Sequence, residues 1–144
     1  MAKTNLAQER RRGRELALHA LYLAVQTDID PHDALDTLPG WPLACDPSKQ
    51  FAEILLERLR RHDDEIDETI AEIIRHWERD RVARIDECII RLGACELIAC
   101  PDIPTAVSIN EAIELAKKYS TEHSGRFVNG ILDAMAAHYL TQDA

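Results

Sequence analysis

Four arginines crowd the N-terminal part of the chain at a spacing that suits the binding of phosphate. They are Arg10, Arg11, Arg12 and Arg14. A guanidinium offers a planar fork of N–H donors to phosphate oxygens and a flat face for a nucleobase. At about 100° per residue the four side chains fan around more than half of a helix, which suits a bent nucleic-acid backbone better than a single base edge. The pattern therefore predicts an arm that holds nucleic-acid phosphates.

The position of these arginines gives no advantage to folding. If they lie in the first turn of a helix, they oppose the positive end of its dipole, at about 0.3 to 1 kcal/mol each. The alternative is a solvated basic tail that aids solubility, which is what most charge runs are. Because the run leads directly into an amphipathic segment, we favour the binding interpretation.

A second group of candidate contact residues lies near the other end of the chain. Arg126 and Phe127 are predicted to begin a helix after the connection at 121–125, where free backbone N–H groups and a cation together favour an anion. Phe127 could stack on a base or fill the core, and Tyr22 in the first predicted helix has the same two interpretations. If the first and last helices pack side by side, the two groups form one patch.

The residue pattern supports neither catalysis nor metal binding. The six histidines are scattered singly, and there is no glycine-rich phosphate loop, no Ser-His-Asp arrangement and no metal-ligand spacing. The cysteines lack the two-residue spacing of zinc knuckles and redox motifs. They are Cys45, Cys88, Cys95 and Cys100. We expect reduced, partly buried thiols, no metal, no cofactor and no enzymatic activity.

Charge is distributed unevenly along the 144 residues, whose formal net charge is −9. Residues 1–14 carry five basic side chains against one acidic, a local charge of +4, which leaves −13 on the rest. A cationic arm on an anionic body suits a protein that grips phosphate at one end and is repelled from nucleic acid elsewhere. No apolar run approaches the roughly 20 residues of a membrane helix, and the polar start lacks a secretory signal. We therefore expect a cytoplasmic protein without membrane contact.

Helical periodicity runs through the whole chain, and no strand-like alternation exceeds a few residues. We predict an all-α protein of about seven helices in two packed bundles. The predicted boundaries rest on apolar spacing, capping residues and prolines: a first helix from about Arg10 to Gln26, starts at Asp30-Pro31 and Asp46-Pro47, a charged break from Arg60 to Glu65, and a further start near Asp80. The break divides a single domain into a three-helix half, about 1–63, and a four-helix half, about 64–144.

The segment 105–133 contains residues that local folding alone would not choose. Ser108 and Glu111 have the form of a capping box, which predicts a helix start at Ser108. The next helix contains Asn129 and Gly130, and a glycine there costs roughly 1 kcal/mol relative to alanine. Either a neighbouring helix approaches closely at Gly130 or a ligand needs the backbone near, and we favour close helix packing.

Two stretches of the sequence resemble one known family. The run INEAIELAK followed by RFVNGILD is similar to the C-terminal part of NusB proteins, and RRRGRELALHALY resembles their opening helix. The resemblance spans most of the chain and is weakest between Thr27 and Asp80. It implies a bacterial transcription antitermination factor with two helical bundles.

The resemblance also implies partners and contact residues. NusB proteins bind the boxA element of ribosomal RNA leaders, together with the small-subunit ribosomal protein NusE, to keep the RNA polymerase elongation complex from terminating. By matching positions, RNA contact falls on the N-terminal arginines, Tyr22 and Phe127, and Asp86 falls on the NusE surface. Two departures from the family pattern are Gly13, which should loosen the helix start, and His123, where some relatives have an acid.

Single-stranded RNA is the expected nucleic acid, because the chain offers arginines and scattered aromatics but no recognition helix for a DNA groove. One alternative stays open, a homodimeric helical interaction module without intrinsic RNA affinity. Salt separates the two, because RNA binding through several arginines weakens steeply as salt rises whereas an apolar dimer does not.

Overall fold

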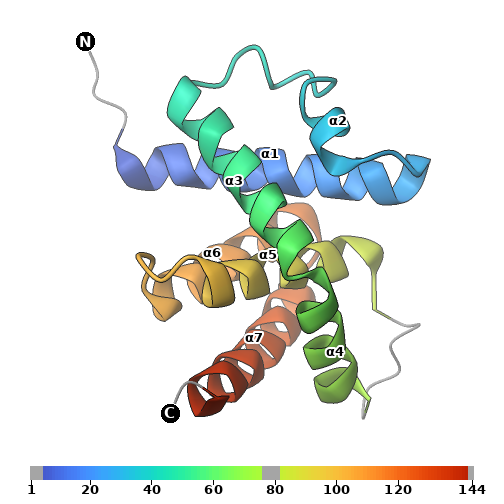
Figure 1. Ribbon diagram of the computed structural model, residues 1–144, viewed down its shortest axis with the longest axis vertical. Coiled ribbons are helices and arrows are strands. Elements are labelled where there is room, and N and C mark those ends of the chain that lie inside the picture. Colours follow the sequence, from blue (N-terminus) through green and yellow to red (C-terminus); the bar gives the residue numbers. More distant parts are fainter. Residues whose placement is uncertain (1–4, 76–81, 143–144) are drawn as a thin grey trace. The chain divides into compact units, whose positions relative to one another are not determined.

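The computed structural model describes residues 5–75 and 82–142, and within them it contains helices but no strands (Figure 1). The described helices are α1 (Leu6–Thr27), α2 (Pro31–Leu35), α3 (Asp46–Arg61), α4 (Asp63–Ile74), α5 (Arg84–Ala99), α6 (Thr105–Tyr119) and α7 (Glu122–Gln142). The prediction of an all-α protein is confirmed. Two compact units divide the chain, Met1–Glu57 and Arg58–Ala144, so the boundary falls inside α3 rather than at the charged break that follows it. Each helix in residues 5–75 and 82–142 is too short or too polar to span a lipid bilayer.

The first unit is built around α1. Asn5 caps this helix, because its side chain accepts a hydrogen bond of 2.7 Å from the backbone N–H of Gln8. The helix therefore begins at Leu6, about one turn before the predicted start at Arg10, although Leu6 itself is 60% exposed. Capping rather than apolar spacing sets this end. As a result the arginines lie beyond the first turn, where the positive end of the helix dipole no longer opposes them as predicted.

The prolines predicted two helix starts well. Asp30 caps α2 by accepting a hydrogen bond of 2.8 Å from the N–H of His32, as the Asp-Pro pair predicts. Asp46 is already inside α3, whose N-terminal cap is one residue earlier than predicted. The predicted charged break is reduced to the single residue His62, because α4 already begins at Asp63. Three acidic residues lie in the first turn of α4, where their negative charge interacts favourably with the positive end of the helix dipole. The predicted start near Asp80 lies outside the described residues.

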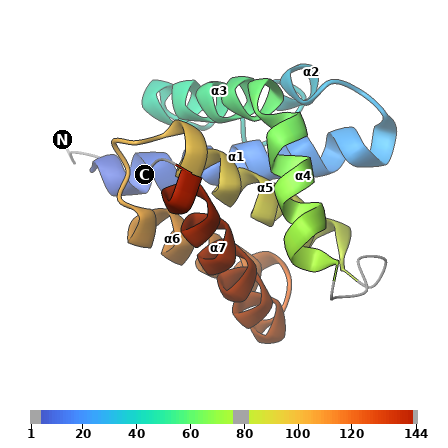
Figure 2. The same cartoon turned by 60° about the horizontal axis from the view of Figure 1, so that its bottom comes forward.

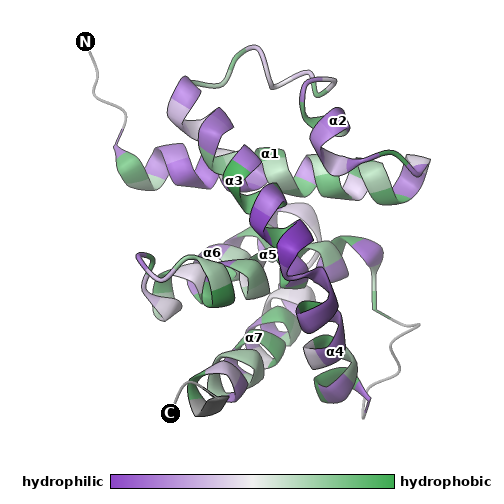
Figure 3. Cartoon of the chain, in the orientation of Figure 1, coloured by the Kyte–Doolittle hydropathy of each residue, from purple (hydrophilic) through white to green (hydrophobic). Residues whose placement is uncertain are grey.

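The second unit packs α5 against α4, α6 and α7, and α6 also lies along α7 (Figure 1 and Figure 2). Hydrophobic residues recur between hydrophilic ones along α6 and α7 (Figure 3), as amphipathic helices require. The core of α5 includes Ile89 and Ile90, which are fully buried. Gly93 of α5 lets α7 approach, because a Cβ there would lie 2.7 Å from Leu132 Cδ1.

The predicted capping box at Ser108 is wrong. The helix α6 begins at Thr105, with Pro104 at its cap position and no side-chain capping bond. Ser108 is buried one turn inside the helix, and its hydroxyl donates a hydrogen bond of 3.0 Å to Glu96 Oε1 of α5. The serine and the buried Glu111 thus belong to the packing of α6 rather than to its start.

Candidate nucleic-acid interface

The four arginines of α1 take different positions in the structure. Arg10 and Arg14 are one turn apart, and both lie over the ring of Phe51 from α3, at 5.6 and 5.3 Å from its centroid. These distances are within the range of cation–π attraction. Arg11 is exposed, and Arg12 is half-buried, with Nη1 3.9 Å from Glu15 Oε1.

Arg14 differs from the other three because it is only 3% exposed. Its guanidinium lies against the Phe51 ring, so in this structure it offers almost no surface to a polyanion. Arg14 therefore supports the pairing of α1 and α3. Its assignment as a direct phosphate contact finds no support in this geometry.

Gly13 lies where α1 packs directly against α3. A Cβ at this position would lie 2.8 Å from the backbone oxygen of Ser48 and 2.9 Å from Phe51 Cδ2. Ser48 in turn donates a hydrogen bond of 2.8 Å from its hydroxyl to the carbonyl of Glu9. The absence of a side chain at Gly13 leaves room for Ser48 and Phe51 of α3. The expectation that this glycine loosens the helix start stays a prediction.

The two aromatic candidates are both partly accessible. Tyr22 is half-buried on α1, and Phe127 is half-buried on α7 beside the fully buried Val128. Each ring can therefore present an edge or part of a face to solvent while its remainder packs. Stacking and packing stay compatible for both residues.

The start of α7 lies earlier than predicted, at Glu122. Thr121 caps it, because its hydroxyl accepts a hydrogen bond of 3.0 Å from the N–H of Ser124. Arg126 is consequently in the second turn, beyond the free N–H groups of the helix start. The prediction of an anion site made by Arg126 and those N–H groups is wrong, although the Arg126 side chain is exposed.

Asp86 anchors the beginning of α7 to α5. Its Oδ2 accepts a hydrogen bond of 2.8 Å from the hydroxyl of Ser124, which lies 2.9 Å from the hydroxyl of Ser120. Asp86 is 6% exposed, and its Oδ1 is buried without a hydrogen-bond partner among the described residues. Ser124 was not predicted as a functional residue, because its only signal in the sequence is its three-residue spacing from Thr121. The carboxylate has an internal partner, and its contact with NusE stays a prediction.

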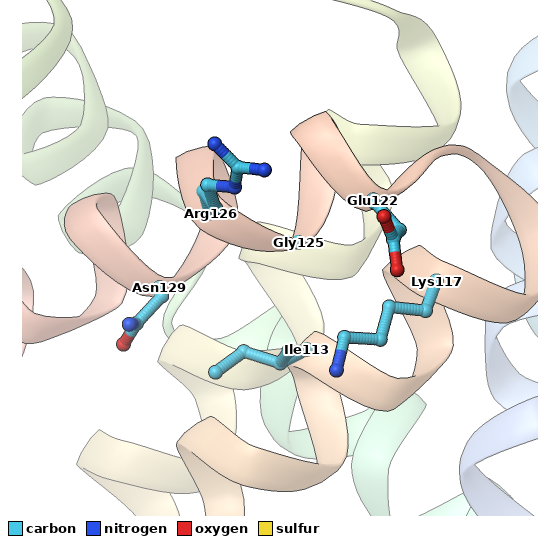
Figure 4. Close-up of a pocket in the computed structure, with 6 residues that line it drawn as sticks. All are labelled: Ile113, Lys117, Glu122, Gly125, Arg126 and Asn129. Carbon is cyan, nitrogen blue, oxygen red and sulfur yellow. The ribbon is translucent and has the colours of Figure 1, made fainter.

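A hollow of about 300 Å³ lies beside Arg126, between α6 and α7 (Figure 4). It is lined by Ile113 and Lys117 from α6 and by Glu122, Gly125, Arg126 and Asn129 from α7. Gly125 forms part of the wall, and a Cβ there would be in ordinary contact with Lys117 Cγ at 3.5 Å. Its lining combines two cations, one carboxylate and one amide, which can bind polar groups of both donor and acceptor type.

The arginine group and the Arg126 group belong to different units, so their union in one patch stays a prediction. No group of three His, Cys, Asp or Glu side chains is arranged for a metal in residues 5–75 and 82–142. Among the free cysteines Cys45 is exposed and the other three are buried. Burial raises the pKa of Cys88 to about 11 and the pKa of Cys95 to about 12, so these thiols stay protonated and inert near neutral pH.

Comparison with known proteins gives one consistent answer. The NusB family model matches residues 11–137. Transcription antitermination protein NusB of Myxococcus xanthus is 44% identical over 133 residues, which cover 88% of this chain and 94% of that protein. The NusB of Salinibacter ruber is 43% identical, covering 88% of this chain and 79% of that protein.

Solved structures agree with the sequence match. NusB of T. maritima aligns with a TM-score of 0.81 at 35% identity, covering 94% of this chain and 93% of that one. A structure of antitermination factors NusB and NusE in complex with dsRNA aligns with a TM-score of 0.81 at 27% identity, covering 92% and 98% of the two chains. The sequence and the fold lead to the same conclusion, that this chain belongs to the NusB family.

Proposed function

We propose that this protein is a transcription antitermination factor that binds boxA RNA of ribosomal RNA leader transcripts together with NusE. In this role it acts on the RNA polymerase elongation complex in the cytoplasm and catalyses no reaction. Two relatives above 40% identity are named as transcription antitermination proteins. A related structure contains NusB, NusE and double-stranded RNA, which supports NusE and RNA as classes of partner, and the single-stranded form is our own proposal.

The observation that carries the proposal is the cationic surface of α1 on an otherwise acidic chain. Arg11 is exposed and Arg10 and Arg12 are half-buried, while the chain as a whole carries −9. Phosphates are attracted to this surface and repelled by most of the rest, so binding is directed to one place. We assign phosphate contact to these three arginines and to Arg126, and we assign Arg14 to the support of Phe51.

The aromatic candidates have a complementary role in the proposal. Tyr22 and Phe127 are half-buried and can stack on unpaired bases, which is how proteins hold single-stranded RNA. A boxA strand offered alone should therefore bind more tightly than the same strand annealed to its complement. Stronger binding of the duplex would contradict the stacking roles, because paired bases are closed to aromatic side chains.

The test is a titration of boxA RNA against the wild type and an Arg11→Ala, Arg12→Ala variant, with and without NusE, at several salt concentrations. Each lost phosphate contact should reduce the slope of log affinity against log salt by about 0.7 on a single strand. The double variant should therefore bind more weakly and with a slope smaller by about 1.4. Arg60→Ala, Arg61→Ala is the matched control, because both side chains are exposed at the end of α3.

The same titration decides between the proposal and its alternative. Equal affinity and slope for the wild type and the α1 variant would exclude phosphate contact by these arginines. Self-association that does not weaken with salt, measured by sedimentation, would then support a homodimeric interaction module.

A further inference from the structure

The loop between α2 and α3 places a tryptophan beside the cationic surface of α1. Leu38, which is 8% exposed, anchors the loop in the core. The N–H of Trp41 donates a hydrogen bond of 3.0 Å to the carbonyl of Leu38, and the N–H of Ala44 donates one of 3.2 Å to the carbonyl of Trp41. These bonds fix the backbone on both sides of Trp41, and the residue is half-buried. Part of the indole is therefore held at the surface.

Gly40 leaves room for an arginine of α1 to lie against this loop. A Cβ at Gly40 would overlap the terminal nitrogen Nη2 of Arg12. The other terminal nitrogen, Nη1, is 3.9 Å from Glu15 Oε1, which is beyond hydrogen-bond distance. Arg12 is half-buried, so its guanidinium lies next to the residue before Trp41 and can still donate to a phosphate.

Gly130 of α7 shows why the contact at Gly40 is informative. A Cβ at Gly130 would meet no atom within 4 Å, so the predicted close approach of a neighbouring helix there is wrong. Open space beside a glycine identifies no ligand. At Gly40, in contrast, the space is filled by a cation that lies next to an aromatic residue.

A second cation reaches Trp41 from the first turn of α3. The ammonium of Lys49 lies 5.3 Å from the centroid of the Trp41 ring, within the range of cation–π attraction. Lys49 is half-buried, and its flexible four-carbon stem lets the ammonium turn from the ring to a nearby anion. Residues 37–45 carry no charge themselves, although Asp36 and Asp46 flank them. The two cations therefore lie at an indole within a neutral loop.

These groups match the chemistry of an unpaired nucleotide. Aromatic rings stack on bases of any sequence, and nearby cations hold the phosphates that join those bases. Arg12, Trp41 and Lys49 all belong to the first compact unit, Met1–Glu57, so their arrangement does not depend on the second unit.

A protein is the competing occupant of this surface, because Leu43 in the same loop is 87% exposed. Single exposed apolar side chains are common on protein surfaces, however, and they mark an interface only when they form a contiguous patch. An acidic protein segment would be attracted to Arg12 and Lys49, but its carboxylates gain nothing from the negative face of an indole. A nucleotide uses both the cations and the ring, so RNA fits the surface better.

We propose that Trp41 stacks on one unpaired base of the bound RNA and that Arg12 and Lys49 hold the phosphates of that nucleotide and its neighbour. This site rests on the proposed RNA binding. It adds a base contact in the loop between α2 and α3, in the part of the chain where the resemblance to NusB proteins is weakest. The RNA thus contacts the protein beyond the arginine run of α1.

Substitutions of Trp41 in the full chain test the stacking. The RNA is boxA with several unpaired nucleotides on each side, and urea denaturation of each variant records its stability. Trp41→Leu, which fills part of the space of the ring but is not flat, should weaken binding by about fivefold or more. Trp41→Phe keeps a ring and should bind within about twofold of the wild type. Equal affinity of the wild type and Trp41→Leu, or equal losses in both variants, would overturn the proposal.

Fluorescence gives a second measurement that does not depend on stability. The chain has two tryptophans, Trp41 and Trp77, so Trp41→Phe leaves only the second. A base in contact with the indole of Trp41 should quench its fluorescence when RNA saturates the wild type. The quenching should disappear in Trp41→Phe although this variant still binds. Unchanged fluorescence of the saturated wild type would exclude stacking on Trp41.

The phosphate contact of Lys49 has a matched control in the second unit. The ammonium of Lys118 on α6 lies 5.4 Å from the centroid of the Tyr119 ring, so it forms the same kind of pair. Lys49→Gln should reduce the slope of log affinity against log salt by about 0.7, whereas Lys118→Gln should leave it unchanged. An unchanged slope in Lys49→Gln, or an equal reduction in both variants, would overturn the phosphate contact.

The outcomes separate this inference from the proposed function. If the wild type shows no salt-dependent RNA binding, the proposed function fails. If the wild type binds but Trp41→Leu binds equally well, RNA binding stands and the site at Trp41 is excluded. If Trp41→Leu weakens the binding of NusE in the absence of RNA, the loop belongs to a protein interface and the inference is overturned.

Discussion

Phe51 holds two guanidinium groups on a single ring, and this gives members of one arginine run different tasks. Arg14 is buried against the ring, while Arg10 lies over it and remains half-buried at the surface. An arginine in solution samples many rotamers, and fixing one on binding costs about 0.5 to 1.5 kcal/mol. The ring restricts this freedom before RNA arrives. We therefore expect Phe51 to position the arginines rather than to contact phosphate itself.

Phe51→Leu tests that role. The variant keeps every arginine, so the number of phosphate contacts and the salt slope should stay the same. Affinity should fall by about two- to tenfold, because the arginines must now be ordered during binding. Titrations at several salt concentrations measure both quantities, and Phe51→Tyr, which retains the ring, should bind like the wild type. A smaller slope in Phe51→Leu would instead show that a phosphate contact had been lost.

At the scale of elements, the crossing of α1 and α3 determines where the arginines lie. Gly13 and Gly40 both border groups that a Cβ would overlap, but the groups differ in kind. At Gly13 the neighbour is the Ser48 carbonyl of the α3 backbone, whereas at Gly40 it is the terminal nitrogen of the flexible Arg12 side chain. A helix backbone cannot move locally without disturbing its packing, but a side-chain end can rotate away.

Gly13→Ala should therefore destabilise the fold, although alanine is the better helix former by about 1 kcal/mol. We expect a net loss of about 1 to 3 kcal/mol in the free energy of unfolding, typical of overpacking. Gly40→Ala should stay within about 0.5 kcal/mol of the wild type. Urea denaturation of both variants measures the difference, and equal stability of the two would show that α3 shifts freely against α1.

The sequence predicts a helix end correctly where the hydrogen bond that sets it joins neighbouring residues. It fails where a side chain contacts a residue far away in the sequence. Asp30 beside a proline marks a helix start because the capping bond spans two residues. Ser108 misled the capping-box prediction because its partner is Glu96, twelve residues earlier on another helix. The burial of Arg14 was hidden for the same reason, since Phe51 lies on a different helix. The candidate arginines could thus be identified from the sequence. Which of them is buried and which is exposed could be learned only from the tertiary contacts.

On the scale of the whole molecule, 26 acidic residues oppose 17 basic ones, so RNA can bind only where cations are gathered. The first turn of α4 alone carries Asp63, Asp64 and Glu65. The phosphates of an RNA that approaches such a surface are repelled. This repulsion discriminates against RNA molecules that do not also make favourable contacts at the cationic site. The same excess of negative charge also affects folding, since it grows as pH rises and destabilises the compact state.

Ionisation of two buried thiols also lowers the stability of the fold at alkaline pH. Burial raises the pKa of Cys88 from 9.0 to about 11 and the pKa of Cys95 to about 12. Because the folded state keeps these protons to higher pH than the unfolded state does, the contribution is fully present below pH 9. It declines as pH rises from 9 through the folded-state values of about 11 and about 12.

Comparing the wild type with a Cys88→Ala, Cys95→Ala variant isolates that contribution. Cavities should make the variant less stable at pH 8, but its stability should fall less steeply between pH 9 and pH 11. General repulsion affects both proteins alike, so the difference in slope reports the thiols, at up to about 1.4 kcal/mol per pH unit for each. Urea denaturation at closely spaced pH values gives the two curves. Parallel curves would mean that the thiols ionise as easily in the folded chain as in the unfolded one, and would contradict a pKa raised by burial.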